Sequence, residues 1–172
     1  MAKPIELILM KAYKPEMIAY VKSHPASFKE LVLLSVEDEK YLSWRAAWVI
    51  SEVMEENDKR LHGVVDKILG VLSRKKDGHQ RELLKVLCKM KLNEDQEALL
   101  FDICLNIWQQ IHKRPSVRHT AFKYIMQLAQ KYPDLQNELN FLTQEHYLET
   151  LSPGIKKVVC RDTEIFLNKK KE

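Results

Sequence analysis

Apolar residues recur along the chain at intervals of three and four, which is the period of an amphipathic helix. One run, within 58–74, has its apolar positions at Leu61, Val64, Val65, Ile68, Val71 and Leu72. Similar runs occupy 39–55, 95–112, 116–132 and 154–168. No stretch shows the sustained period-two alternation that is typical of a half-buried strand. The pattern therefore predicts an all-α protein.

Prolines mark several of the predicted helix starts. Five of them stand where the apolar pattern pauses: Pro15, Pro25, Pro115, Pro133 and Pro153. Proline is tolerated in a first helical turn because the amide there has no intrahelical partner. The predicted helices are 4–12, 15–23, 26–36, 39–55, 58–74, 79–91, 95–112, 116–132, 134–148 and 154–168. Since the connections are short, we expect neighbouring helices to pack antiparallel.

Three predicted helices share an arginine near their start. Their sequences there are Trp44-Arg45-Ala46-Ala47-Trp48, Gln80-Arg81-Glu82-Leu83-Leu84 and Val117-Arg118-His119-Thr120-Ala121. The arginines are 36 and 37 residues apart, a length that two helices and two turns fill. One helix pair cannot bury its apolar stripe alone, so pairs of this length are expected to stack in a row.

Two of these segments carry a resemblance to a known family. Ser43-Trp44-Arg45-Ala46-Ala47-Trp48 and Ser116-Val117-Arg118-His119-Thr120-Ala121 resemble the arginine-then-alanine start of a HEAT-repeat helix. The resemblance implies a short right-handed α-α superhelix of antiparallel helix pairs, armadillo-like, that binds partners. It covers 39–148, which we take as the repeat core of a single domain, 1–172. Residues 1–36 are then atypical N-terminal helices, and 149–172 a C-terminal capping helix with a basic tail.

Composition narrows the class of protein further. Of 172 residues, 45% are hydrophobic and 30% are charged, which allows a sizeable core under a well-solvated surface. The longest apolar run is five residues, Ala46 to Ile50, whereas a membrane helix needs about 20. Three widely spaced cysteines, Cys88, Cys104 and Cys160, are typical of thiols in a reducing compartment. We expect a cytoplasmic protein without a membrane partner.

The chain has a net charge of +4, which is not evenly spread. Residues 1–73 are net −1 and residues 74–172 are net +5. Basic turn residues form a candidate basic edge that phosphates could contact: Arg74, Lys75, Lys76, Lys113 and Arg114. The simpler interpretation is that these charges complement the dipoles of the helices that end beside them.

Two further groups are candidates for contact with a partner. Tyr41, Trp44 and Trp48 lie near one side of their helix, where they either anchor a partner or fill the gap between repeats, with Trp44 the better candidate for exposure. A polar strip on the second helix of each pair is expected to line the inner surface of the stack: Asp66, Asp102, Asn106, Gln109, Gln136, Asn140 and Gln144. Asp102 would suit acid–base chemistry if buried, but its helical spacing from Asn106 predicts a solvated position.

No motif for catalysis, a metal or a cofactor is present in the sequence. The six histidines include no pair at i, i+4, and there is no glycine-rich phosphate loop, G-x-S-x-G or C-x-x-C. Fumarase and adenylosuccinate lyase share a loop of the pattern G-S-S-x-M-P-x-K-x-N. The sequence has no such loop. We therefore expect neither enzymatic activity nor a bound cofactor or metal.

These observations favour a non-catalytic scaffold that binds a protein or peptide on the concave face of a short solenoid. The alternative is a nucleic-acid-binding HEAT-like protein, including one related to DNA repair. In it Trp44, Trp48 and Asp102 would take the roles that HEAT-like glycosylases give to aromatic residues and an acid. The oligomeric state is open, and Ile5, Ile8 and Leu9 offer an apolar seam for a dimer.

Overall fold

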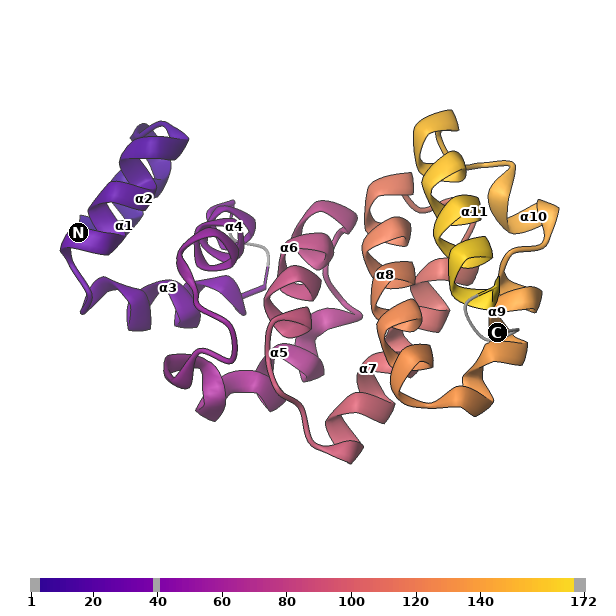
Figure 1. Cartoon of the computed structure of the whole chain (residues 1–172). Coiled ribbons are helices and arrows are strands. Elements are labelled where there is room, and N and C mark those ends of the chain that lie inside the picture. Colours follow the sequence, from indigo (N-terminus) through magenta and orange to yellow (C-terminus); the bar gives the residue numbers. More distant parts are fainter. Residues whose placement is uncertain (1–3, 39–40, 169–172) are drawn as a thin grey trace. The chain divides into compact units, whose positions relative to one another are not determined.

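The computed structural model describes residues 4–38 and 41–168, and every regular element in these ranges is a helix. In chain order the elements are α1 (Pro4–Lys11), α2 (Lys14–Ser23), α3 (Ser27–Ser35), α4 (Ser43–Val53), η1 (Lys59–Val64), α5 (Val65–Leu72), α6 (Asp77–Cys88), α7 (Glu94–Gln109), α8 (Pro115–Lys131), η2 (Pro133–Leu135), α9 (Gln136–Leu142), α10 (Glu145–Leu148) and α11 (Pro153–Asn168), where η marks a 3₁₀ helix (Figure 1). The all-α prediction is confirmed. The predicted basic tail, Lys169 to Lys171, lies outside the described residues.

The chain divides into two compact units. Unit 1 is Met1–Gln96 and unit 2 is Glu97–Glu172. Helix α7 begins in the last residues of unit 1 and continues in unit 2. The division of one domain into a repeat core at 39–148 and two atypical ends stays a prediction.

The helices of unit 1 form two layers. In one layer α4 packs between α2 and α6, and in the other α3 contacts α1 and η1. The layers are joined by contacts of α3 with α4 and of α5 with α6. Figure 1 shows α2, α4 and α6 in an upper row with α3 and α5 below them. Consecutive helices thus alternate between layers, which confirms the predicted helix pairs.

Helices α4 and α6 pack against one another. Ala46 and Ala47 of α4 are fully buried, as are Leu83 and Leu84 of α6. The exposed residues of α4 are Trp44 and Glu52.

The dimer seam expected on the first helix is wrong. Ile5 and Leu9 are buried inside unit 1, and Ile8 is half-buried. Their helix, α1, packs against α2 and α3. The exposed apolar side chains of α1 are Leu7 and Met10 instead, so the sequence pattern identified an amphipathic helix but its apolar face serves the core.

Two predicted helices are divided in the structure. In 58–74 a 3₁₀ helix precedes α5, because the Asp58 side chain accepts the Arg60 amide proton at 3.0 Å and Gly63 weakens the α-helix. In 134–148 the helix breaks at Thr143, whose hydroxyl donates to the Leu139 carbonyl at 2.9 Å.

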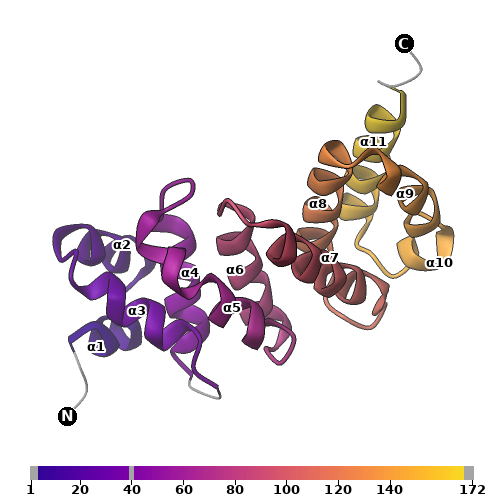
Figure 2. The ribbon, with the colours of Figure 1, turned by 90° about the horizontal axis from the view of Figure 1, so that it is seen from below.

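Unit 2 is built around α8, which packs against α11 and η2; Figure 2, seen from below, also shows α11 beside α8. Arg118 of α8 is fully buried. It donates to the Trp108 carbonyl at 2.9 Å, to the Tyr147 carbonyl at 2.7 Å and to the Thr150 hydroxyl at 2.8 Å. Its guanidinium also lies 4.7 Å from the centre of the Trp108 ring. This arginine therefore connects the end of α7 with α10.

Candidate functional site

The outward side of the α2–α4–α6 layer in unit 1 gathers aromatic and cationic side chains. We call it the aromatic–basic face, and its members are Lys14, Trp44, Arg45, Trp48, Arg81, Lys85 and Lys89. Trp44 is 42% exposed, and Trp48 is half-buried. Residues four apart share one side of a helix, so the two indoles lie along the same outward stripe of α4. Trp44 is therefore the more exposed of the two, as the sequence predicted.

Side chains from α2 and α4 hold the tryptophan end of this face. The Lys14 ammonium lies 4.9 Å from the centre of the Trp48 ring, a distance at which a cation is attracted to an aromatic face. Arg45 donates to the Ala12 carbonyl at 3.0 Å, between α1 and α2. The indole of Trp48 is thus fixed by its neighbours, while Trp44 projects beyond them.

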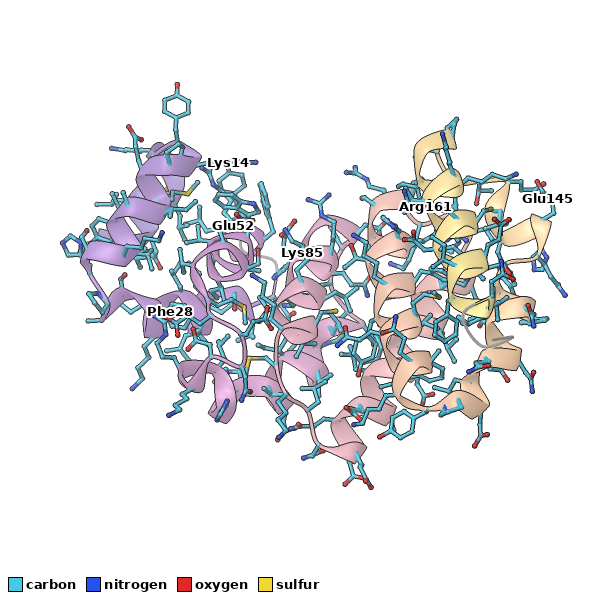
Figure 3. All side chains as sticks on the ribbon, viewed as in Figure 1. Lys14, Phe28, Glu52, Lys85, Glu145 and Arg161 are labelled. Atoms are coloured by element: carbon cyan, nitrogen blue, oxygen red, sulfur yellow. The ribbon has the colours of Figure 1, made fainter. Side chains whose placement is uncertain are left out.

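A buried carboxylate organises the α6 end of the face. Glu82 is fully buried; its Oε1 accepts from Arg81 Nε at 2.9 Å and from Arg81 Nη2 at 2.7 Å. Its Oε2 accepts from Lys85 Nζ at 2.6 Å. Lys85 Nζ also lies 3.9 Å from Glu52 Oε1 on α4. Figure 3 labels Lys14, Glu52 and Lys85, one from each of the three helices in this layer.

Positive charge exceeds negative charge on this face. Its cations are Lys14, Arg45, Arg81, Lys85 and Lys89, and its anions are Glu52 and Glu82, a formal excess of three positive charges. Lys89 Nζ donates to the Ser51 carbonyl at 2.8 Å, which places it beside α4. The face combines flat apolar surface with N–H donors, the composition that interface centres favour.

The predicted polar strip lies at the surface in both units. Asp66 is exposed in unit 1 and accepts from Gln96 Nε2 at 2.7 Å. In unit 2 the exposed members are Asp102, Asn106, Gln109, Asn140 and Gln144, and Gln136 is half-buried. Asn106 Oδ1 accepts from Gln110 Nε2. Asp102 therefore sits in solvent, which gives it no environment for acid–base chemistry; the strip as a binding surface stays a prediction.

The predicted basic edge loses its middle member. Arg74 and Lys76 are exposed, but Lys75 is only 7% exposed. Its ammonium donates to the Val36 carbonyl at 3.0 Å, to the Glu37 carbonyl at 2.7 Å and to Asp38 Oδ1 at 2.6 Å. These atoms follow the end of α3, where a cation complements the helix dipole. Lys75 is thus placed to complement the dipole of α3 in unit 1, and it does not face an external phosphate.

Two titratable groups beside Lys75 respond to this arrangement. The hydrogen bond and charge of Lys75 lower the pKa of Asp38. His79 Nε2 lies 2.7 Å from the Ser35 carbonyl, and burial lowers the pKa of this imidazole. In unit 2 the remaining edge residues, Lys113 and Arg114, are half-buried and exposed respectively. Whether the edge binds an anion stays a prediction.

Unit 2 has an open cavity of about 300 Å³ between α8 and α11, which the sequence did not predict. It is lined by His119, Phe122, Lys123, Met126, Gln127, Gln130, Val159, Asp162, Ile165 and Phe166. Burial lowers the pKa of His119 at its edge. The lining combines apolar side chains with polar and charged ones, among them His119, Lys123 and Asp162.

Part of the aromatic–basic face had a signal in the sequence. The 36-residue spacing of the predicted repeat relates Arg45 to Arg81, so an alignment of the repeats would have placed these two residues on neighbouring helices. Lys14 had none, since it lies outside the three segments that share the arginine-led start. The buried Glu82 was equally unexpected, because charged residues are almost never fully buried unless they are paired.

Residues 4–38 and 41–168 contain neither a cluster for a metal ion nor a membrane-spanning helix. No group of three or more histidine, cysteine, aspartate or glutamate side chains in these ranges could hold a metal ion. No helix there is both long and apolar enough to cross a membrane.

Comparison with known proteins identifies the repeat. The family model of the HEAT repeat domain matches residues 8–164. No curated protein and no solved structure gave a significant match. HEAT repeats generally act as scaffolds for protein interactions. Because the matched range covers most of the chain and the structure consists of paired helices, the chain belongs to the HEAT-repeat family.

Proposed function

We propose that this chain is a non-catalytic scaffold that binds a protein or peptide partner through the aromatic–basic face of unit 1. The observation that supports this most directly is the exposure of Trp44, 42% of whose surface is open beside the half-buried Trp48. Tryptophan is enriched among the residues that contribute most to protein binding. A helix presents it with little loss of conformational freedom on association.

Loss of the Trp44 side chain tests this proposal. Full-length wild-type protein and a Trp44→Ala variant are each immobilised, and the proteins that they retain from native lysate are quantified. We expect the bound partner to fall by about tenfold or more for Trp44→Ala, since a central aromatic anchor is typically worth 2 kcal/mol or above.

Leu33→Ala is the matched control. Leu33 is 45% exposed on α3, in the other layer of unit 1, so its truncation removes a similar apolar side chain without touching the face. Retention of the same partner by wild type and by Trp44→Ala would refute the assignment of this face. Recovery of no protein by wild type would refute the scaffold function itself.

The polar strip offers a second surface for the same function. Asn106 and Gln109 are exposed neighbours on α7, and a double Asn106→Ala, Gln109→Ala variant belongs in the same capture experiment. If this variant loses the partner and Trp44→Ala does not, the contact lies on the strip.

We also propose the cytoplasm as the location of this protein. The chain has three widely spaced cysteines, Cys88, Cys104 and Cys160, and Cys104 is buried. Such thiols are typical of a reducing compartment. Fluorescence microscopy of the tagged full chain would check this.

A further inference from the structure

We propose that the aromatic–basic face binds an acidic protein segment that carries an apolar side chain for Trp44. This inference rests on the proposed scaffold function and adds the chemistry of the partner.

The charge of the face differs from that of the rest of unit 1. The five cations and two anions of the face leave an excess of three positive charges, whereas all other residues of 1–96 sum to −1. An anionic partner is therefore attracted more strongly to this face than to the rest of unit 1 taken as a whole. Charge complementarity of this kind guides association and selects the partner.

A protein segment fits the pattern of charges better than a nucleic-acid strand. Glu52 is exposed in the middle of the face, 3.9 Å from Lys85, and a regular line of phosphates would pass over it. A peptide instead places single carboxylates beside Lys14, Arg81 and Lys85 and leaves Glu52 unopposed. Its apolar side chain can cover Trp44, which a phosphate backbone cannot do.

The two α6 cations are already held in position. Glu82 fixes Arg81 through two hydrogen bonds and Lys85 through one. Arginine has five N–H donors and lysine three, so both keep donors for a second carboxylate. Because their side chains are ordered before binding, less conformational entropy is lost when a partner arrives.

Peptide binding to the full chain tests the inference. The probe is a fluorescein-labelled synthetic peptide of glutamate, aspartate and a central leucine, measured by fluorescence anisotropy. The matched peptide has glutamine and asparagine in place of the acids. We expect the acidic peptide to bind about tenfold tighter or more, and its affinity to fall as salt is raised, because exposed ion pairs are screened.

Charge reversal locates the peptide. A double Arg81→Glu, Lys85→Glu variant is expected to weaken binding of the acidic peptide by at least about tenfold. The control is Lys29→Glu, Lys67→Glu, which makes the same change in net charge at two exposed lysines of α3 and α5, and should bind as wild type does. Since the first variant places new carboxylates next to Glu82, Lys14→Glu is tested as well; Lys14 is exposed, so its reversal leaves the fold intact and should also weaken binding.

Three results would overturn the inference. One is equal binding of the acidic and the amide peptide. Another is equal loss of binding in the Lys29→Glu, Lys67→Glu control. The third is tighter binding of an oligothymidylate of matched charge, which would assign the face to nucleic acid. The scaffold function would survive the first two if Trp44→Ala still lost its partner in the capture experiment.

Discussion

The two units bury different polar groups at the same point of the repeat. In unit 1, Gln80 near the start of α6 is buried and donates to the Leu72 carbonyl, the last residue of α5, at 3.1 Å. In unit 2, Arg118 near the start of α8 is buried and donates to the Trp108 carbonyl, near the end of α7, at 2.9 Å. Both side chains reach back to the end of the preceding helix.

The difference lies in how far each group extends. A guanidinium has five donors and an amide two, so Arg118 also reaches Tyr147 and Thr150. In unit 1 the arginine follows one position later, at Arg81, and joins the aromatic–basic face. A repeat therefore specifies where a polar side chain must meet the backbone, while the choice of side chain decides whether that contact also holds the next helix.

Truncation of Arg118 should have the largest effect on stability. Arg118→Ala leaves two carbonyls and a hydroxyl without their donor, and we expect the free energy of unfolding to fall by about 4 kcal/mol. Arg118→Gln, which imitates unit 1, should cost about 2 kcal/mol because it keeps one of the three contacts. Gln80→Ala should cost about 1 kcal/mol. Urea unfolding followed by circular dichroism measures all three, and equal losses for Arg118→Ala and Gln80→Ala would contradict the comparison.

Substitutions of the neighbours Lys75 and Lys76 should differ clearly in their effect on stability. Lys75→Met removes three hydrogen bonds at the end of α3 and is expected to destabilise unit 1 by about 2 kcal/mol. Lys76→Met changes an exposed lysine and should remain within about 0.5 kcal/mol of wild type. Thermal or urea unfolding of the two variants provides the measurement. A similar loss of stability in both variants would contradict the buried role of Lys75 and would favour its predicted place on the basic edge.

Acidification should destabilise both units through histidine. Burial lowers the pKa of His79 in unit 1 and of His119 in unit 2 below the ordinary 6.5. The neutral form is favoured by folding, so its contribution is complete above about pH 6.5 and is lost as the pH falls through the lowered pKa. We expect His79→Gln and His119→Gln each to flatten the decline in unfolding free energy between pH 7 and 5. An unchanged pH profile in both variants would contradict this.

A second acid step belongs to unit 1 alone. The hydrogen bonds from Arg60 hold the pKa of Asp58 at about 2, below its ordinary value of 3.8. The carboxylate form is favoured by folding, so this contribution is lost as the pH falls from about 4 through 2. Asp58→Asn should remove that step from a pH titration of stability, whereas Asp66→Asn, at an exposed aspartate of α5, should keep it.

A loss of stability smaller than that of Arg118→Ala is expected at the proposed binding residue. Trp44→Ala removes a side chain that is 42% exposed, so it should lower the free energy of unfolding by about 1–2 kcal/mol. Its effect on partner capture should nevertheless be large. Denaturation of this variant therefore checks that a lost partner reflects a lost contact and not a lost fold.

The periodicity of apolar residues predicted most of the fold. Helix starts at Pro15, Pro115 and Pro153 agree with the structure within a residue or two, because proline and the apolar stripe act locally. The break at 64 was missed, since it depends on the Asp58 side chain, which accepts the Arg60 amide proton. The break at 143 has no such explanation, because Thr120 and Thr163 make the same hydroxyl bond as Thr143 inside unbroken helices. Such bonds are allowed by the sequence but are not required by it.

The candidate site was less predictable than the fold. The exposure of Trp44 follows from the alanine and valine positions that face inward on α4. The three arginines, in contrast, have the expected spacing but three different surroundings: a loop carbonyl for Arg45, a carboxylate for Arg81 and the core for Arg118. A shift of one residue turns a helical side chain by about 100°, which spacing alone does not reveal.

The contacts of Arg118 also set an order of events during synthesis. The ribosome releases the chain from its N-terminus, so α8 emerges before the acceptors at Tyr147 and Thr150 have left the exit tunnel. Until residue 150 leaves the exit tunnel, water must solvate this guanidinium, and the last turns of the nascent chain complete the interior of unit 2.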